Sequence, residues 1–383
     1  MRTIGVVTVG RSDYGIYLPL LRKLKADPEV KLRMIVSGMH LSPHFGLTVE
    51  NIQADGFVID ERIEMLLSSD SPEGITKSMG LGLIGFAQAF ARTRPDILVV
   101  LGDRFEMHSA ALAALPFMIP VAHIHGGELT QGAIDDSLRH SITKLSHLHF
   151  VSTEAYKKRV VQLGEEPSRV HMVGALSLDN LGEIKLRNAL ELEEKYHFKL
   201  DPFTLLVTFH PVTLEYLQTE WQIKQLLAAI DSTGLPVIFT KPNADTNNSV
   251  IIRLLEEYVQ NHKNAWLIDN FGIQDYYSMM KISAAMVGNS SSGIIEAASF
   301  ELPVVNIGNR QKGRISGKNV INTGYECSQI TQGILHAVSQ DFRASLSDLQ
   351  NPYGNGKTAD QIVSVLKNVD LGHELIGKTF YDG

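Results

Sequence analysis

Short runs of apolar residues alternate with segments of helical period along the whole chain, and this alternation constrains the fold more than any other feature. In the first half we expect buried strands at Ile4–Val9, Leu32–Ser37, Ile97–Leu101, Ile119–Ile124, Leu148–Val151 and Val170–Val173. In the second half the corresponding runs are Leu205–Phe209, Val237–Thr240, Ala265–Ile268, Ala284–Val287 and Val304–Ile307. Apolar strands separated by helices are typical of parallel sheets covered on both faces. The sequence therefore predicts an α/β fold with two Rossmann-like domains and a cleft between them.

The length and the restart of the pattern predict the domain boundaries. A chain of 383 residues is too long for one ordinary core. The boundary is expected between Gly174 and Pro202, where a charged helical segment, Glu183–Tyr196, occurs. We expect an N-terminal Rossmann-like domain over 1–180, a C-terminal Rossmann-like domain over 181–355, and a helix and tail over 356–383 that pack back on the first domain.

Composition excludes several classes of function. The net charge is −7 and no basic cluster stands out, which argues against nucleic-acid binding. The apolar run near the N-terminus spans about seven residues, too few for a membrane span, and lacks a signal-peptide cleavage pattern. The single cysteine, Cys327, excludes an intrachain disulfide and a cysteine metal cluster. We expect a cytoplasmic protein that does not bind membranes.

The segment Gly288–Glu296, with the sequence GNSSSGIIE, predicts an anion site in the second half. It lies between an expected strand and an expected helix over Ile294–Phe300, so free N–H groups and the helix dipole face a ligand. The hydroxyls of Ser290 and Ser291 add donors for phosphate oxygens, and Glu296 is placed for ribose hydroxyls. The alternative is a serine-rich turn that only caps a helix.

Two polar clusters follow strands of the first half. Arg11 lies in GRSDYG after the first strand and suits a phosphate, although the turn can also be a simple helix cap formed by Asp13 or Ser12. This cluster lacks the full G-x-G-x-x-G pattern, so it does not indicate a nicotinamide cofactor. Asp103 follows Ile97–Leu101, a common position for an acid–base carboxylate, and the alternative is a helix N-cap. Arg104 beside it is a further candidate for contact with the substrate.

A third cluster, HIHGGE followed by DDSLRH, is dense in ionisable groups. His125 and Glu128 are candidates for proton transfer, the alternative for the histidines being a satisfied core position. Asp135 begins a helix, and Arg139 one turn later either forms an ordinary helical ion pair or holds a carboxylate ionised. The residue types would also allow zinc, but their spacing matches no familiar ligand set, so we expect no metal and no other cofactor.

The second half adds candidates at its own strand ends. His210 follows Leu205–Phe209 and can bond a phosphate or act as an acid toward a leaving phosphate. Asn243 follows the next strand, and Arg310 follows the strand after the serine-rich turn. Arg310 is therefore a second candidate for binding diphosphate charge.

Taken together, the motifs GRSDYG, LGDRFE, HIHGGE, IDDSLRHSITKLSH, FHPVT, GNSSSGIIE and GNRQKGR resemble the hydrolysing UDP-N-acetylglucosamine 2-epimerases of bacterial sialic-acid pathways. The resemblance covers residues 1–360 approximately. It implies a GT-B-like fold in which the domain over 181–355 binds UDP. It also implies a homodimer or homotetramer. The implied reaction converts UDP-N-acetylglucosamine and water to N-acetylmannosamine and UDP by C2 deprotonation with UDP elimination, followed by hydration. No metal or NAD is implied.

The resemblance also assigns roles. Asp103 matches the strand-end aspartate of the family, and Asp135 and Arg139 match the acidic residue and the arginine of the following helix. His210 matches a histidine near the diphosphate. The nucleotide contacts match at Arg11, Ser290, Ser291, Glu296 and Arg310. One departure from the family matters: many members read HIEGGE where this chain reads HIHGGE. His125 therefore stands where they have a glutamate, and Asp103, His125, Glu128 and Asp135 are all eligible as the base.

Three alternatives remain at this point. A hydrolysing 2-epimerase of UDP-2,4-diacetamido-2,4,6-trideoxyglucose, from a legionaminic-type pathway, would carry the same UDP and acid–base motifs. A non-hydrolysing epimerase would return UDP-N-acetylmannosamine. A GT-B glycosyltransferase, from another class, would need an acceptor groove and often a membrane-facing patch, neither of which is apparent. A sensor of sugar nucleotides would not need so many ionisable groups at strand ends.

Overall fold

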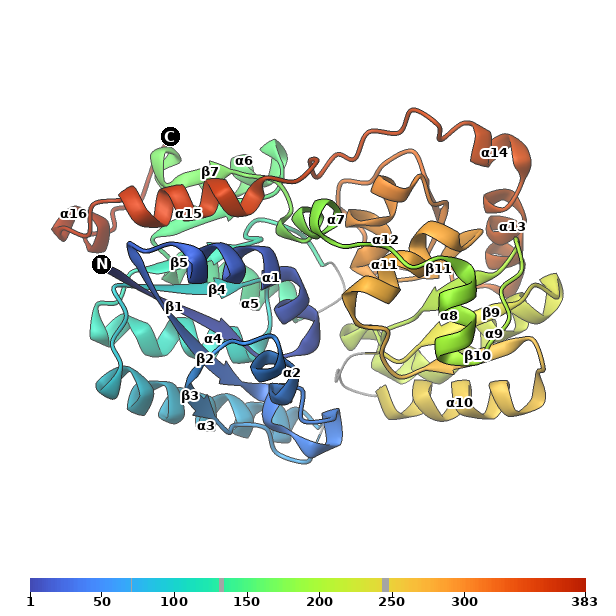
Figure 1. Ribbon diagram of the computed structural model, residues 1–383, viewed down its shortest axis with the longest axis horizontal. Helices are drawn as coiled ribbons and strands as arrows, with labels where there is room; N and C mark the ends of the chain where they lie inside the picture. The colour runs from blue at the N-terminus through green and yellow to red at the C-terminus, as the bar shows by residue number, and fades with distance from the viewer. Residues whose placement is uncertain (70, 131–133, 243–247) are drawn as a thin grey trace. The chain divides into compact units, whose positions relative to one another are not determined.

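The computed structural model in Figure 1 describes residues 1–69, 71–130, 134–242 and 248–383. The chain divides into two compact units. Unit 1 comprises Met1–Glu128, Asp135–Gly182 and Tyr353–Gly383, and unit 2 comprises Leu129–Ile134 and Glu183–Pro352.

Unit 1 is built around a parallel sheet, in which the described residues form seven strands in the order β3-β2-β1-β4-β5-β6-β7. The strands are β1 (Arg2–Thr8), β2 (Val30–Ser37), β3 (Ile59–Ile63), β4 (Ile97–Leu101), β5 (Val121–Ile124), β6 (Leu148–Val151) and β7 (Val170–Met172). The α-helices are α1 (Arg11–Ala26), α2 (Val49–Ala54), α3 (Pro72–Arg92), α4 (Phe105–Ala114), α5 (Asp135–Leu145), α6 (Glu154–Gln162), α7 (Asn180–Glu183, at the boundary), α15 (Thr358–Asn368) and α16 (His373–Ile376). Strand β4 is fully buried, as expected for a strand covered on both faces.

Unit 2 repeats this plan with a six-stranded parallel sheet among its described residues, in the order β10-β9-β8-β11-β12-β13. The strands are β8 (Leu205–Thr208), β9 (Val237–Thr240), β10 (Ala265–Ile268), β11 (Ala285–Gly288), β12 (Val304–Ile307) and β13 (Val320–Thr323). The α-helices are α8 (Ala189–Tyr196), α9 (Thr219–Thr233), α10 (Asn248–Asn261), α11 (Gly272–Ile282), α12 (Ser291–Ile295), α13 (Cys327–Ala337) and α14 (Gln340–Ala344).

The order of the strands fixes where a ligand can bind in each unit. Successive strands run outward from β1 in one direction and from β4 in the other, so the order reverses between β1 and β4. In unit 2 the same reversal occurs between β8 and β11. Ligands of open α/β sheets bind at the carboxyl ends of the strands beside such a reversal. The turns that follow these four strands are therefore the places to look for a site.

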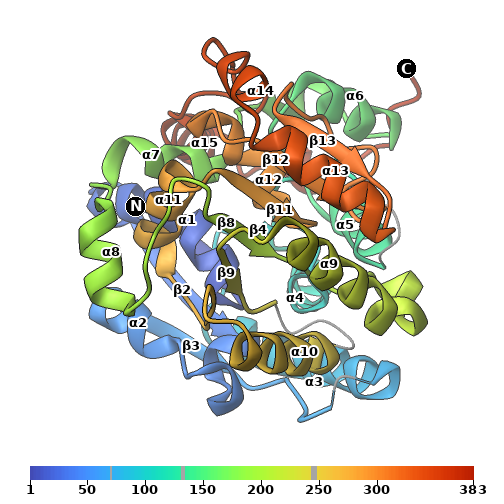
Figure 2. The same ribbon diagram turned by 90° about the vertical axis from the view of Figure 1, so that its right-hand side faces the viewer.

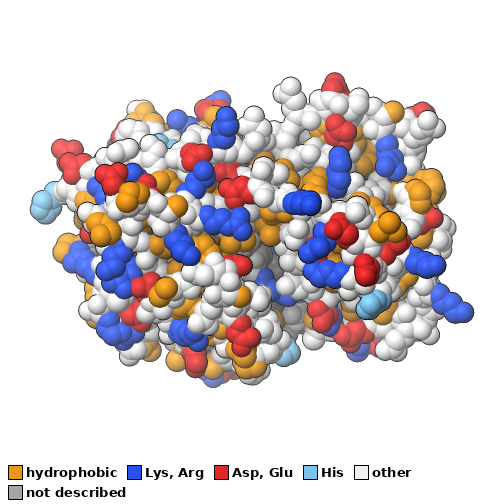
Figure 3. All heavy atoms as spheres, viewed as in Figure 1, with side chains coloured by type: hydrophobic (Ala, Val, Ile, Leu, Met, Phe, Trp, Pro, Cys, Tyr) orange, Lys and Arg blue, Asp and Glu red, His pale blue; other side chains and the backbone are white. Residues whose placement is uncertain are grey.

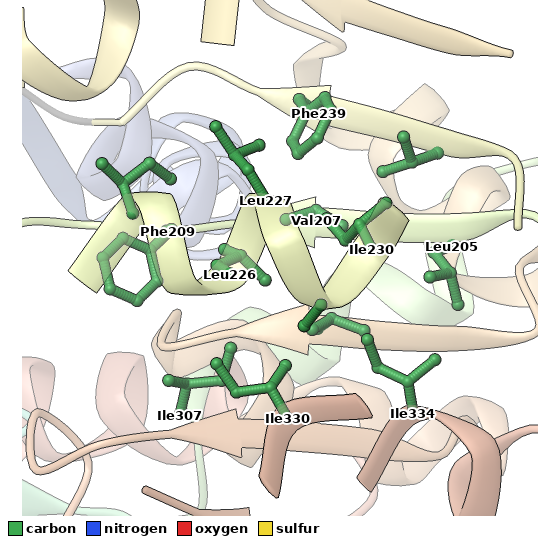
Figure 4. Packing of buried hydrophobic residues seen from close by; sticks show 14 of the residues in the cluster. Leu205, Val207, Phe209, Leu226, Leu227, Ile230, Phe239, Ile307, Ile330 and Ile334 are labelled. Carbon is green, nitrogen blue, oxygen red and sulfur yellow. The ribbon is translucent and has the colours of Figure 1, made fainter. Parts of the chain in front are cut away.

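Apolar side chains from helices and strands far apart in the sequence form the core on one face of the unit 2 sheet. Figure 4 shows Leu226 and Ile230 of α9 beside Val207 of β8, with Ile330 and Ile334 of α13 in the same cluster. All five side chains are at most 1% exposed. Figure 2 shows α9, α10 and α13 on this side of the unit. The burial explains why these helices carry apolar residues at three- and four-residue spacing.

Helix α15 lies far along the chain but packs on the first helix of unit 1, near the N-terminal strand (Figure 1). The guanidinium group of Arg2 donates to the carbonyl oxygen of Leu366 over 2.6 Å. Lys367 forms an ion pair of 2.8 Å with Asp27, just after α1. These polar contacts connect residues more than 300 positions apart in the sequence within unit 1.

Two helices differ from the expected ones. The segment Ile294–Phe300 does not form one α-helix, because α12 ends at Ile295 and a separate 3₁₀ turn covers Ala297–Phe300. The charged helix begins only at Ala189, where Asn188 and Glu191 form a reciprocal capping box that fixes its start.

The described helices include none that is both long and apolar enough to cross a membrane. Figure 3 shows acidic and basic side chains interspersed over the visible face.

Candidate active site

In unit 1 the predicted ionisable residues meet around the guanidinium group of Arg139 on α5. Its Nη2 atom donates to a carboxylate oxygen of Asp103, in the turn after β4. Its Nη1 atom lies 3.4 Å from a carboxylate oxygen of Glu128 and 3.3 Å from the carbonyl oxygen of His125. The Arg139 side chain is 2% exposed and that of Asp103 is 20% exposed. The buried Arg139 side chain thus contacts the segments that carry Asp103, His125 and Glu128. The carboxylate of Asp103 is more accessible to solvent than that of Glu128.

His125 is held in an unusual conformation directly after β5. Its backbone φ is +65°, a left-handed value that costs a non-glycine residue about 1–3 kcal/mol. Its Nδ1 atom lies 2.6 Å from a carboxylate oxygen of Glu128. Because an ionised carboxylate only accepts, Nδ1 carries the hydrogen and Nε2 is the basic nitrogen. The buried Nε2 atom has no hydrogen-bond partner among the described residues, so it is available to exchange a proton.

Glu128 has little capacity left to act as a base. Besides His125 and Arg139, the hydroxyl group of Ser152 donates to it over 3.1 Å, and its side chain is 2% exposed. A buried carboxylate with three donors is best suited to orient its partners. Ser152 was not among the sequence candidates, because only the fold brings β6 beside the HIHGGE turn.

His123, two residues before His125, has a structural position. Its Nε2 atom is 2.7 Å from the carbonyl oxygen of Gly102, to which it donates, and its Nδ1 atom is 3.2 Å from the hydroxyl oxygen of Thr143. Burial lowers the pKa of His123 to about 3, so the ring is neutral near pH 7. The two histidines therefore differ, because His123 is a satisfied core residue and His125 is not.

The remaining candidates of unit 1 lie at the starts of helices. Asp135 is the first residue of α5, one turn from Arg139 on the same side of the helix, and is partly exposed. Arg11 is the first residue of α1 and is exposed. Arg104 precedes α4, and its guanidinium group bonds Glu106 over 3.1 and 3.2 Å.

In two of these turns, the residues that could have capped the following helix do not cap it. Neither Ser12 nor Asp13 caps α1, because the N-cap residue is Gly10 and no side chain bonds it. Asp103 does not cap α4 either, since the N-cap residue is Arg104. Its carboxylate is directed to Arg139 instead.

In unit 2 the serine-rich turn follows β11 as expected. Gly288 has a φ of +135°, and a Cβ atom there would lie 2.0 Å from the carbonyl oxygen of Thr208, so only glycine fits. The hydroxyl oxygen of Ser290 accepts from the amide of Ser292 over 3.3 Å and caps α12. Ser290 and Ser291 remain partly exposed, whereas Glu296, at the end of α12, is buried.

Asn289 connects the predicted phosphate-binding residues of unit 2 to one another. Its side chain makes two bonds with the backbone of His210, of 2.7 and 2.8 Å. Its carbonyl oxygen accepts from the guanidinium group of Arg310 over 3.1 Å and from the amide of Gln311 over 2.8 Å. Its place inside GNSSSG was the only sequence signal for Asn289, and Gln311 had none beyond its neighbour Arg310. Asn243 lies outside the described residues.

Comparison with known proteins decides the family. A family model described as UDP-N-acetylglucosamine 2-epimerase matches residues 22–367. The chain belongs to this epimerase family. A Campylobacter jejuni GDP/UDP-N,N'-diacetylbacillosamine 2-epimerase (hydrolyzing) is 44% identical over 100% of this chain and 99% of its own length. An Escherichia coli polysialic acid biosynthesis protein P7 is 38% identical (100% and 98%), and a Legionella pneumophila UDP-N,N'-diacetylbacillosamine 2-epimerase (hydrolyzing) is 36% identical (99% and 99%).

Solved structures agree on the fold of this epimerase. The S. aureus MnaA–UDP co-structure superposes with a TM-score of 0.82 at 18% identity, covering 100% of each chain. The predicted class, two Rossmann-like domains of GT-B type, is confirmed. The described residues contain no group of three or more histidine, cysteine, aspartate or glutamate side chains arranged to hold a metal ion.

Proposed function

We propose that this epimerase hydrolyses UDP-2,4-diacetamido-2,4,6-trideoxyglucose, that is UDP-N,N'-diacetylbacillosamine, to UDP and the free 2-epimeric sugar. The choice of sugar is supported by the two relatives named for this substrate, at 44% and 36% identity. The similarity therefore favours the modified sugar over UDP-N-acetylglucosamine, the substrate first expected from the motifs.

The observation that carries the chemistry is the pairing of two proton-transfer groups through one buried arginine. Inversion at C2 requires that a proton leave one face of the sugar and return on the other, so two groups are needed. Asp103 offers the more accessible carboxylate, and His125 offers the unpartnered Nε2 atom. Arg139 orders Asp103 and Glu128, and Glu128 in turn fixes the tautomer of His125.

The proposed reaction has two steps. A base takes the proton from C2 while the C1–O bond to the diphosphate breaks, and the electron pair of the C–H bond becomes the C1=C2 double bond. Water then adds, with its hydroxyl group going to C1 and a proton going to C2 from the opposite face. Ser290, Ser291 and Arg310 stabilise the leaving UDP by hydrogen bonds and charge.

A second substrate also has support. The relative at 38% identity is named for polysialic acid biosynthesis, which favours UDP-N-acetylglucosamine as the source of N-acetylmannosamine. The two sugars differ at C4 and C6 only, so the proton chemistry at C2 is the same for both.

A comparison of the two UDP-sugars as substrates tests the proposal. Purified protein is incubated with each in D2O, and UDP release and the free sugar are followed by NMR. We expect kcat/KM to be at least about tenfold higher for the diacetamido sugar, since a pocket built for an amide disfavours a ligand that lacks it. A preference for UDP-N-acetylglucosamine would establish the second substrate, and a product that retains UDP would exclude hydrolysis.

A further inference from the structure

The segment after α16 places one lysine at the C-terminal end of α5, the helix that carries Arg139. The ammonium group of Lys378 donates to three carbonyl oxygens there, those of Ser146 at 2.6 Å, Lys144 at 2.8 Å and Thr143 at 3.4 Å. The last carbonyl groups of a helix have no partner within the helix and carry partial negative charge. Lys378 therefore satisfies the end of α5 from a distance of more than 230 residues along the chain.

A buried carboxylate holds Lys378 in this position. Glu165, just after α6, lies 2.6 Å from its ammonium nitrogen, and the side chains are 1% and 18% exposed respectively. Glu165 also pairs with His149 at 2.9 Å and with Lys144 at 2.7 Å. Burial alone raises the pKa of Glu165, but these partners outweigh burial and bring it to about 2. The carboxylate is thus charged at neutral pH.

The residues that follow Lys378 also contact the region around Glu165. The amide of Tyr381 donates to the carbonyl oxygen of Gly164 over 3.0 Å. The ring of Phe380 lies against Gly164, where a Cβ atom would come within 2.2 Å of it. The ammonium group of Lys144 lies 4.9 Å from the centre of that ring. Figure 1 shows this end of the chain near α6 and β7.

The end of α5 is connected in turn to the turn that carries Asp103. Thr143, whose carbonyl oxygen accepts from Lys378, places its hydroxyl oxygen 3.2 Å from Nδ1 of His123. The other ring nitrogen of His123 donates to the carbonyl oxygen of Gly102 over 2.7 Å. Thr143 and His123 are fully buried, and Gly102 has a φ of +75° that fixes the turn before Asp103.

We propose that Lys378 is a positioning residue for the proton chemistry, because it fixes α5 and, through Thr143 and His123, the distance between Arg139 and Asp103. The inference rests on the proposed function. Small displacements of catalytic groups by distant substitutions can lower turnover by about 10²-fold. Lys378 itself touches none of the reacting groups described above, so its effect should appear in kcat.

The test compares Lys378→Met with a matched control. Lys367→Met makes the same chemical change on α15, removing ion pairs of 2.8 and 2.6 Å to Asp27 and Glu29 that involve no residue of α5. We expect Lys378→Met to lower kcat by about 10- to 100-fold with KM changed less than about twofold. Lys367→Met should keep both constants near wild type, and Lys378→Arg should recover most of kcat, since a guanidinium group also donates to carbonyl oxygens.

A second variant and a second readout keep the test independent of folding defects and of substrate identity. Thr143→Val removes the bond to His123 and leaves the ion pair, and it should also lower kcat. Hydrogen exchange of amides over residues 139–146, measured without substrate, should rise in Lys378→Met and not in Lys367→Met. Equal kcat losses in both lysine variants, or unchanged kcat and exchange in Lys378→Met, would overturn the inference. A wild-type protein that turns over neither UDP-sugar would instead count against the proposed function, because the exchange result stands apart from it.

Discussion

The Nδ1 atom of His125 lies 2.6 Å from a carboxylate oxygen of Glu128, three residues further along a turn that begins in a left-handed conformation. This contact gives the second histidine of the HIHGGE motif a defined tautomer. Backbone strain of this kind is concentrated at functional sites. His125 combines such strain with a buried ring of which only Nδ1 has a partner among the described residues, so it is the first residue to test.

Replacement of His125 should abolish most of the turnover without weakening UDP binding. His125→Asn is the best variant, because asparagine tolerates a positive φ better than most residues. Since general acid–base groups commonly contribute 10²–10⁴-fold, we expect a kcat loss of about that size. Steady-state kinetics and calorimetric titration with UDP provide the measurement. Near-normal turnover would make His125 a packing residue.

Glu128→Gln should reproduce much of the His125 defect. An amide at this position can donate to Nδ1, and this favours the wrong tautomer of the imidazole ring. We expect kcat to fall by about 10²–10⁴-fold. The matched control is Ser152→Ala, which removes one neutral donor from the same carboxylate and should cost at most about tenfold. Equal losses in the two variants would show that Glu128 only needs its donors and does not set the tautomer.

Asp103→Asn should slow proton exchange at C2. The amide keeps the shape of the side chain but cannot accept a proton at neutral pH, so we expect kcat to fall by about 10²–10⁴-fold while UDP affinity is kept. Product made by the wild-type protein in D2O should carry deuterium at C2, which mass spectrometry detects. Product without deuterium would contradict the elimination mechanism altogether. Asp135→Asn, measured alongside, tests the other eligible carboxylate.

Arg310→Ala should weaken UDP binding about ten- to hundredfold, because the loss of a charge-assisted hydrogen bond costs about 1.5–3 kcal/mol. Ser290 needs two variants, since its hydroxyl group also caps α12. Ser290→Gly keeps most of the capping preference and Ser290→Ala loses it. Equal losses of UDP affinity in calorimetry would indicate direct contact with the phosphate, whereas a loss in Ser290→Ala alone would indicate capping.

Asp13 should make unit 1 less stable as the pH rises from about 4 to about 6. Burial raises its pKa from 3.8 to about 6, so the folded state binds this proton more tightly than the unfolded state. The stability that Asp13 contributes is fully present below the pKa of the unfolded state. It is lost as the pH rises through the pKa of the folded state. The difference between the pKa of the folded state and that of the unfolded state corresponds to about 3 kcal/mol of stability.

Asp13→Asn removes this titration and can keep the bonds that Oδ2 accepts from Thr8 at 2.6 Å and from the Val9 amide at 3.0 Å. The variant should therefore have a higher Tm than the wild-type protein at pH 7.5 and the same Tm near pH 4. Calorimetric scans across this range provide the check. A Tm difference that is independent of pH would rule out titration of Asp13 as the cause.

The central strands were predictable because they are buried on both faces and read as continuous apolar runs. The two strands that the pattern missed, β3 and β13, lie at the edges of their sheets. β3 carries Asp60, Glu61 and Arg62, and all four residues of β13 are at least partly exposed, so neither produces an apolar run. A search for continuous apolar runs therefore misses strands of this composition.

The residues of the candidate site were predictable by type and position, but their partners were not. Asp103, Glu128 and Arg139 come from three separate strand ends or helices, so only the folded chain shows which of them meet. The pairing of Arg139 along its own helix was the natural expectation, and the contacts with Asp103 and Glu128 depend on tertiary structure. The preferred sugar could not be predicted at all, because substituents at C4 and C6 leave no motif.

The return of α15 to unit 1 has a consequence for synthesis of the chain. Unit 1 is interrupted by the 170 residues Glu183–Pro352 of unit 2, and α15 and Lys378 are translated after them. At roughly 5–20 residues per second, the ribosome needs about 10–30 s to make that insertion. During this time the nascent first domain lacks the helix that packs on α1 and the lysine that completes α5. Unit 2 can therefore finish folding before unit 1, because the last described segment of unit 1 is translated after the whole of unit 2.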